Sequence, residues 1–331
     1  MRLSLEQSAL LRQRAAVQAE QAHADQGGLG PAPARPRLPP WISAPLPGGE
    51  RYAAIKTKLR DRKLHTVCEE AQCPNIGQCW NEGTATLMLM GDTCTRACKF
   101  CAVKSNPRPA PLDIDEPHKA AEQVGLMGLD YVVLTSVNRD DLPDGGADHF
   151  AQTVRAIKQI SPRTLVEVLT PDFEGRLVDV ARVLDAGPDV FAHNIETVQR
   201  LQRQVRDRRA SFDQSLAVLQ FAKRHRPQVV TKSSIMLGLG EADPEVDAAL
   251  VALRDHAVDA VTLGQYLRPS PWHHEVVRFA DPAEFVQWQQ RAEALGFAYC
   301  ASGPLVRSSY RAGEHYLRGL AKARQAATCA D

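Results

Sequence analysis

The sequence lacks the features that mark several large classes of protein. Its net charge is only +1, with 40 basic and 39 acidic residues among 331, so no basic excess predicts a nucleic-acid partner. No apolar run approaches the roughly 20 residues that a membrane-spanning helix needs, and no secretory signal peptide is recognisable. We therefore expect a cytoplasmic protein without nucleic-acid or membrane partners, in a compartment where thiols stay reduced.

What the sequence does contain is a concentration of cysteine, because six of the eight fall into two groups of three. The first group is Cys68, Cys73 and Cys79 in CEEAQCPNIGQC, and the second is Cys94, Cys98 and Cys101 in CTRACKFC. Each group is one ligand short of the four thiolates that normally hold an iron–sulfur cube. Metal sites that perform chemistry keep a position open, so the pattern predicts two clusters with different roles.

Two other uses of cysteine are alternatives at this stage. A disulfide framework is typical of small secreted chains, whereas this chain is long and carries no secretory signal. Structural zinc is the stronger alternative, but zinc sites usually show paired C-x2-C spacings that close to four ligands. Neither group of three has a nearby fourth cysteine, so the spacing favours iron–sulfur clusters.

From about residue 84, short apolar strands alternate six times with amphipathic helices. The predicted strands are 86–90, 131–136, 165–169, 190–194, 230–236 and 260–264. The predicted helices are 117–128, 147–160, 174–186, 211–225, 244–257 and 282–295. Asp243 and Asp281 are predicted N-caps because each precedes a proline at the first helical position, and Glu284 completes a capping-box pattern with Asp281.

Six strand–helix units predict an α/β fold with a parallel sheet and helices outside it. They are too few for a closed eight-fold barrel, so we expect a partial (βα)6 TIM-like barrel with N- and C-terminal extensions. Barrel active sites lie at the carboxyl ends of the strands, which is where the second cysteine group falls. Ser136, Glu167 and Asn194 are candidate ligand contacts at those ends, although each could equally be a buried, hydrogen-bonded core residue.

The second cysteine group, C-x3-C-x2-C with the aromatic Phe100 before its last cysteine, resembles the signature of the radical S-adenosylmethionine (SAM) superfamily. The resemblance implies a partial barrel of the radical SAM type and a 4Fe–4S cluster on Cys94, Cys98 and Cys101. It further implies that SAM binds the fourth iron and is cleaved to a 5′-deoxyadenosyl radical. Phe100, Ser136, Glu167 and Asn194 are then the candidate SAM contacts, and no catalytic side chain is expected beyond the clusters.

Further motifs resemble the lipoyl synthase family over residues 38–315. They are C-x4-C-x5-C upstream, TSVNRDDLPDGGA (135–147), LTPDF (169–173), HNIET (193–197), LGLGE (237–241), LGQYLRPS (263–270) and GPLVRSSY (303–310). The chain departs from the usual family pattern at a few places beside these motifs. The departures are Lys99, Asn138, Ser234, 205–212 and 273–279.

This resemblance implies insertion of two sulfur atoms at carbons 6 and 8 of an octanoyl chain held on a carrier lysine. It implies that a second 4Fe–4S cluster, on Cys68, Cys73 and Cys79, supplies the sulfur, with Ser309 as its fourth ligand and Arg307 nearby. The implied partners are octanoylated lipoyl domains of 2-oxoacid dehydrogenase complexes or the glycine cleavage H protein, reduced flavodoxin or ferredoxin, and an iron–sulfur carrier that rebuilds the cluster.

Four regions are expected along the chain. They are a poorly ordered N-terminal extension (1–50) with a weak helix at 4–22, a segment for the auxiliary cluster (51–83), the barrel (84–300) and a C-terminal segment with the RSSY motif (301–331).

Two rival functions are a radical SAM enzyme with an auxiliary cluster acting on a peptide, and a two-cluster electron carrier. Such carriers are short and close both clusters with four cysteines.

Overall fold

The computed structural model describes residues 38–43, 47–49, 52–53, 56–57, 65–66, 69, 73, 75–81 and 84–309. The chain divides into two compact units, Met1–Pro39 and Pro40–Asp331, and the fold below belongs to the second. The expected extension, including the helix at 4–22, falls mostly outside the described residues, as does Cys68.

An eight-stranded sheet forms the centre of this unit, in the order β1-β2-β5-β6-β7-β8-β9-β10. Its strands are β1 (His65–Thr66), β2 (Thr84–Leu89), β5 (Tyr131–Ser136), β6 (Leu165–Leu169), β7 (Val190–Ala192), β8 (Val230–Leu237), β9 (Ala260–Gln265) and β10 (Tyr299–Gly303). Only β1 pairs antiparallel; the other neighbouring pairs are parallel. Among the described residues, β1 and β10 are not paired with each other, so the barrel is open.

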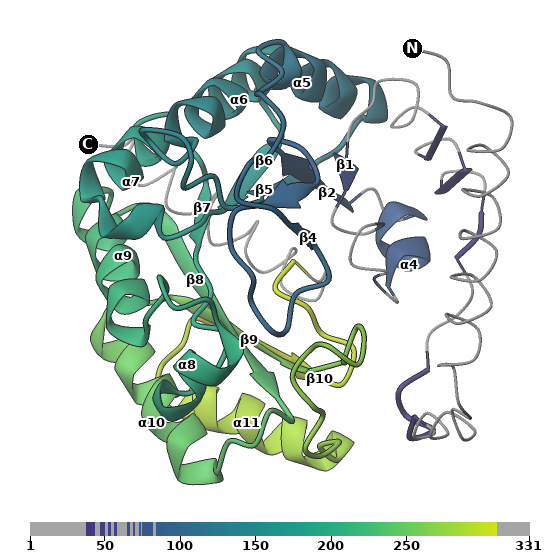
Figure 1. Ribbon diagram of the computed structural model, residues 1–331, viewed down its shortest axis with the longest axis vertical. Coiled ribbons are helices and arrows are strands. Elements are labelled where there is room, and N and C mark those ends of the chain that lie inside the picture. The colour runs from purple at the N-terminus through teal and green to yellow at the C-terminus, as the bar shows by residue number, and fades with distance from the viewer. Residues whose placement is uncertain are drawn as a thin grey trace, which may run out of the picture. The chain divides into compact units, whose positions relative to one another are not determined.

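Helices cover the outer side of the curved sheet (Figure 1). They are α5 (Glu116–Met127), α6 (Ala147–Ile160), α7 (Leu177–Leu184), α9 (Phe212–His225), α10 (Asp243–Asp255) and α11 (Pro282–Ala294). Each follows one of the parallel strands from β2 to β9 in the chain, which gives the six predicted strand–helix units. The predicted partial barrel is confirmed.

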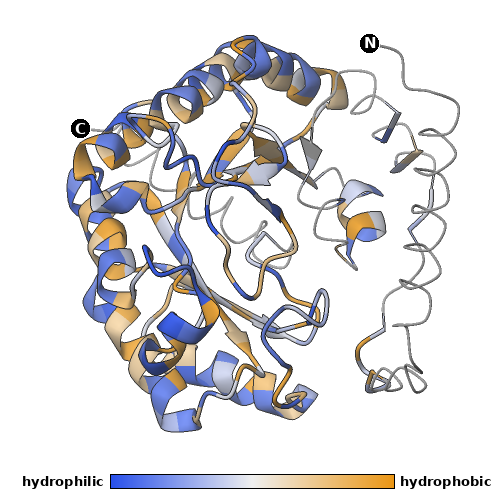
Figure 2. Cartoon of the chain, viewed as in Figure 1, coloured by the Kyte–Doolittle hydropathy of each residue, from blue (hydrophilic) through white to orange (hydrophobic). Residues whose placement is uncertain are grey.

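The amphipathic pattern of α6 shows why the helices adhere to the sheet. Phe150, Val154 and Ile157 are fully buried in the core between sheet and helices, and they recur at the spacing of one helical face. Figure 2 shows the result as alternating hydrophobic and hydrophilic bands along the outer helices. The parallel strands are buried on both faces, as covered parallel sheets must be, and β2 and β9 have no exposed residue.

Several boundaries differ from the predictions for local physical reasons. The helix predicted at 174–186 begins only at Leu177, because Glu174, inside the 3-10 turn η1 (Phe173–Gly175), adopts a left-handed φ of 54° and Arg176 before α7 is extended. Asp281 caps α11 as predicted, since its carboxylate accepts from the Ala283 N–H at 2.8 Å.

The predictions for the two other capping residues were wrong. Asp243 is already helical, and Ala242 stands at the N-cap of α10, where the Glu245 carboxylate accepts from the Ala242 N–H at 2.9 Å. Glu284 completes no capping box in α11. Its carboxylate instead accepts from the Arg278 guanidinium at 2.6 Å.

Some elements were not predicted. These are β1, β10, α4 (Ile76–Asn81), the small pair β3 (Thr93–Cys94) and β4 (Lys104–Ser105), the 3-10 turn η2 (Gln199–Leu201) and α8 (Gln202–Val205). Strand β10 crosses the boundary that we expected at residue 300. Among the described helices, none is long and apolar enough to cross a membrane.

Candidate iron–sulfur and cofactor site

The second cysteine group lies in the loop that follows β2, at the carboxyl end of the parallel strands. Cys94 belongs to β3, which pairs with β4, and this pairing closes the loop that carries Cys98 and Cys101. The Asn106 N–H also donates to the Cys94 carbonyl at 2.9 Å, and this hydrogen bond holds the two ends of the loop together. The chain therefore folds the three thiols into one compact loop over the barrel.

Backbone amides surround the sulfur atoms of this loop. The Arg96 and Asn138 N–H groups donate to Cys94 Sγ at 3.4 and 3.3 Å, and the Asp207 N–H donates to Cys98 Sγ at 3.3 Å. Amide donors favour the thiolate form, and hydrogen bonds to ligand sulfur are one means by which proteins tune iron–sulfur clusters.

Burial opposes the thiolate form at the same positions. It raises the pKa of Cys98 to about 11 and that of Cys101 to about 12, with the neighbouring sulfurs adding to the effect and the amide donors opposing it. A cationic metal cluster would relieve this conflict, because coordination stabilises thiolates. Among the described residues no three Cys, His, Asp or Glu groups converge on a single ion, and in a cube each thiolate holds a different iron.

Arg96, inside the cysteine loop, fastens that loop to the barrel. Its guanidinium donates to Asp140 at 2.7 Å and to Asp172 at 2.8 Å, and its side chain is 3% exposed. The two aspartates follow β5 and β6 in the chain. Bidentate arginine–carboxylate pairs hold their partners in a defined orientation. This network therefore fixes the position of the cysteine loop relative to the strand ends. Sequence reasoning missed it, because its partners are 44 and 76 residues away.

Two of the candidate SAM contacts carry buried polar atoms without a partner among the described residues. They are Ser136 Oγ at the end of β5 and Asn194 Oδ1 just after β7. Thr170 Oγ1 and Thr197 Oγ1, close behind the ends of β6 and β7, share this condition. A buried polar atom left unpaired is costly, so a cluster of them at the strand ends fits a polar ligand there.

The other two candidates lie differently. Glu167 is 1% exposed, and its carboxylate accepts from Lys232 Nζ at 2.9 and 3.0 Å and from the Tyr131 hydroxyl at 2.5 Å. Its oxygens are thus engaged inside the barrel. Phe100 is partly buried and packs against the hydrophobic core cluster that contains Ile235.

Two charged residues beside the cysteine loop, Glu196 and Arg206, both influence the Cys98 thiol electrostatically, and sequence reasoning did not single them out. Burial raises the pKa of Glu196, while burial lowers that of Arg206 against the opposing charges of Glu196 and Cys98. Glu196 also has a left-handed φ of 67°, a strained conformation of the kind that gathers at functional sites. The only sequence signal was its place in HNIET.

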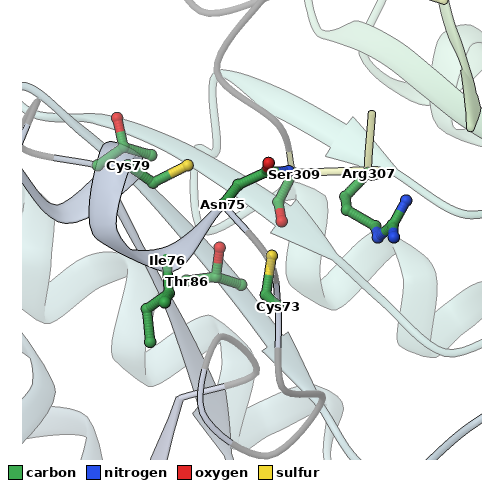
Figure 3. Close-up of a pocket in the computed structure, with 8 residues that line it drawn as sticks. Cys73, Asn75, Ile76, Cys79, Thr86, Arg307 and Ser309 are labelled. Atoms are coloured by element: carbon green, nitrogen blue, oxygen red, sulfur yellow. The ribbon is translucent and has the colours of Figure 1, made fainter. Parts of the chain in front are cut away.

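A second site lies between α4 and the end of the described chain. A small, partly open pocket is lined by Cys73, Asn75, Ile76, Cys79, Thr84, Thr86, Arg307 and Ser309. Figure 3 shows the Cys73 and Cys79 sulfurs and the Ser309 side chain gathered around the same space. Ser308 does not line this pocket, and Cys68 lies outside the described residues.

Close backbone packing brings these distant segments together. Asn75, between the two cysteines, donates from Nδ2 to the Leu305 carbonyl at 2.7 Å. Gly264 in β9 leaves room for the C-terminal segment, because a Cβ there would stand 2.1 Å from the Val306 carbonyl oxygen. Burial raises the pKa of Cys73, while the nearby Arg307 charge acts to lower it. Burial also lowers the pKa of Arg307, so the pocket disfavours the charged form of both groups.

Comparison with known families supplies an independent line of evidence. The radical SAM superfamily model matches residues 88–253, and the model of the N-terminal domain of lipoyl synthase matches residues 10–73. "Lipoyl synthase, mitochondrial" of Danio rerio is 56% identical over 88% of this chain and 74% of its own length. The proteins of that name from Aspergillus niger and Homo sapiens are 58% and 55% identical over 88% of this chain and 71% and 80% of their lengths.

Among solved structures, a crystal structure of methylornithine synthase has a TM-score of 0.49 and 13% identity, covering 74% of this chain and 81% of that one. The names of the sequence relatives overturn one expectation. They are mitochondrial proteins, so the expected cytoplasmic location was wrong; balanced charge and reduced thiols do not distinguish the two compartments.

Proposed function

Because this chain belongs to the lipoyl synthase family of radical SAM enzymes, we propose that its two cysteine groups hold two 4Fe–4S clusters with separate roles. The family's reaction inserts two sulfur atoms at carbons 6 and 8 of a protein-bound octanoyl-lysine. When bound, SAM and its cluster supply the radical that removes hydrogen from these unactivated carbons, and the auxiliary cluster supplies the sulfur. The alternatives of a peptide-modifying enzyme and a plain electron carrier are set aside by family membership.

One observation carries the assignment of the auxiliary site. Cys73 and Cys79 share a pocket with Arg307 and Ser309, although more than 220 residues separate the two segments in the chain. Two thiols and a hydroxyl around one space are a donor set for iron. Cys68 completes the three thiolates in our proposal, and Ser309 is the fourth ligand. The Arg307 guanidinium would balance the negative charge of this set.

The residues of the radical site have distinct tasks. Cys94, Cys98 and Cys101 hold the cluster, with the amide donors around their sulfurs fixing its position. Ser136 and Asn194 offer their unpaired buried atoms to the polar groups of SAM. Phe100 helps to enclose the ligand. Glu167 is left out of the proposed SAM contacts, because Lys232 and Tyr131 already occupy its carboxylate.

The proposed partners are those that membership of the lipoyl synthase family implies. The substrate is an octanoylated lipoyl domain of a 2-oxoacid dehydrogenase complex or the glycine cleavage H protein. Reduced flavodoxin or ferredoxin provides electrons, and an iron–sulfur carrier rebuilds the auxiliary cluster after its sulfur is used.

A single experiment tests this function. Reconstituted enzyme is incubated anaerobically with SAM, a chemical reductant and an octanoylated lipoyl-domain peptide, and the peptide is analysed by mass spectrometry. We expect two sulfurs in place of two hydrogens, with free octanoate converted far more slowly, because remote binding energy positions the reacting carbons. Equal conversion of free octanoate would falsify the carrier-bound assignment, and SAM cleavage without sulfur insertion would contradict the proposed sulfur source.

A further inference from the structure

The loop between Cys98 and Cys101 is held at the surface between two other loops. The Lys99 N–H donates to the Val205 carbonyl at 2.8 Å, and the His274 N–H donates to the Lys99 carbonyl at 2.8 Å. The Lys99 ammonium lies 3.5 Å from the centre of the Trp272 ring. Residues that follow β7 and β9 therefore flank the part of the cysteine loop that reaches solvent.

This surface carries unpaired positive charge. Lys99, Arg203 and Arg208 form no ion pair with any residue that the structure describes, and Arg203 and Arg208 are both exposed. The Arg203 guanidinium donates to the Arg208 carbonyl at 3.0 Å, which keeps the two residues together. We call Lys99, Arg203, Arg208 and Trp272 the basic rim. Figure 2 shows α8, which carries Arg203, as strongly hydrophilic.

The acidic groups near the rim are already engaged. Asp207 accepts from the Arg209 guanidinium at 2.8 Å, and Glu275 lies 3.7 Å from Arg268. The whole chain has a net charge of only +1. The positive charge of the rim is therefore a local feature of this surface and not part of a general excess of positive charge. Trp272 is 53% exposed despite its size, and exposed tryptophan beside basic residues is typical of the residues that dominate protein interfaces.

We propose that the basic rim is the docking surface for an acidic protein that donates single electrons to the radical cluster. This proposal rests on the proposed function. Reductive cleavage of each SAM consumes one electron, so the oxidised cluster must regain one electron and the donor must lose one. Electron transfer weakens steeply with distance, and Lys99 stands between two of the cluster's ligands. Electron-transfer complexes are small and transient, and charge complementarity accelerates their formation.

The octanoylated carrier protein is the other candidate for the basic rim, but the rim suits it less well. Its substrate is carried on a long lysine arm, so the carrier domain itself need not approach the cluster. The auxiliary pocket, where sulfur is transferred, is built from α4 and residues 305–309. Figure 1 shows α4 and α8 on opposite sides of the strand ends, so the carrier is expected on the α4 side.

The test compares Arg203→Glu/Arg208→Glu with the matched control Arg155→Glu/Arg163→Glu. The control reverses two exposed arginines that have no ion pair among the described residues, and Arg163 lies at the opposite end of the barrel, before β6. Binding of an acidic flavodoxin to the reconstituted enzyme is measured at several salt concentrations. We expect the rim variant to bind flavodoxin at least about tenfold more weakly, with an affinity that changes less with salt concentration. The control should match the unmodified protein in both respects.

Formation of 5′-deoxyadenosine with dithionite separates this proposal from the proposed function. A small reductant needs no docking surface, so the rim variant should match the unmodified protein with dithionite and fall behind it with flavodoxin. An unmodified protein inactive with dithionite would refute the proposed function. Unchanged flavodoxin binding, or weakened binding of the octanoylated domain alone, would overturn the docking proposal.

A second variant guards against misfolding of the double variant. Trp272→Ala removes apolar contact area without changing charge, so it should weaken flavodoxin binding while the slope against salt is preserved. Lys99→Gln removes one positive charge of the rim, so it should reduce the dependence of binding on salt. If Trp272→Ala bound flavodoxin as tightly as the unmodified protein and Lys99→Gln kept the full salt dependence, the proposal would also be overturned.

Discussion

At the scale of single residues, the proposed oxygen ligand, Ser309, is the most specific part of the proposed auxiliary site. Ser309 lines the pocket with Cys73 and Cys79, whereas the adjacent Ser308 does not. A serine oxygen is a harder ligand than a thiolate and a poorer match to iron in such clusters. A weak ligand suits a cluster that must come apart to release sulfur.

The substitution Ser309→Cys tests this point. A thiolate should hold the auxiliary cluster more tightly, so both clusters should assemble and SAM cleavage should persist. Lipoyl product per enzyme should fall about tenfold or more, the scale on which changes around a metal alter activity. The measurement is product beside 5′-deoxyadenosine formed. Ser308→Cys is the control with near-normal insertion, and a loss confined to Ser308→Cys would identify the other serine as the ligand.

Residues that belong to short sequence motifs could be predicted, whereas residues defined by contacts between distant segments could not. The clustered cysteines were singled out by their spacing and Ser309 by the resemblance of GPLVRSSY to the lipoyl synthase family, and their roles as ligands stay predictions. Asn75 and Arg96 were not singled out, since a hydrogen bond to Leu305 and an ion pair to Asp172 connect segments that share no local pattern. Glu167 illustrates the opposite case: a polar residue in a strand looked like a ligand contact, but its partner Lys232 is 65 residues away.

At the scale of elements, the regular strand–helix units could be predicted and the irregular ones could not. The strands 131–136 and 165–169 and the helix 147–160 match the structure at both ends, because strong apolar periodicity marks them. Strand β10, with the sequence YCASG, carries little apolar signal and is not followed by a predicted helix. Its pairing with β9 comes from tertiary contacts.

The approach of the C-terminal segment to β9 gives a prediction at this scale. In Gly264→Ala, the new Cβ would stand 2.1 Å from the backbone oxygen of Val306, so the segment carrying Arg307 and Ser309 must move. We expect a cost of about 1–3 kcal/mol in stability and loss of auxiliary-cluster iron, while SAM cleavage continues. Iron content and 5′-deoxyadenosine formation are the measurements.

Gly303→Ala is the matched control for this change. Its Cβ would lie 3.3 Å from Val306 Cγ2, a side-chain atom that can yield, so iron content should stay near normal. If Gly264→Ala kept its full iron and sulfur insertion, the close packing of β9 against the C-terminal segment would not be needed to form the auxiliary site.

At the scale of the whole molecule, two candidate metal sites, built from separate parts of the chain, flank one barrel. The radical site is built inside the barrel repeat, on the loop after its first parallel strand. The auxiliary site joins α4, which precedes the repeat, to residues 305–309, which follow it. The cysteine spacing already predicted two separate sites, but the meeting of α4 with residues 305–309 could be seen only in the fold, because it joins the two ends of the barrel.

This separation predicts that each site can be removed while the other survives. Replacing Cys94, Cys98 and Cys101 with alanine should leave about half of the iron and abolish SAM cleavage, because three of a cube's ligands are lost. Replacing Cys68, Cys73 and Cys79 should also halve the iron but leave SAM cleavage measurable, since the loop after β2 and its anchor at Arg96 are untouched. Iron per folded protein and 5′-deoxyadenosine yield are measured for both variants. Loss of all iron from either variant in a still-folded state would show that the thiols of both groups share one cluster, contrary to the proposal of two separate sites.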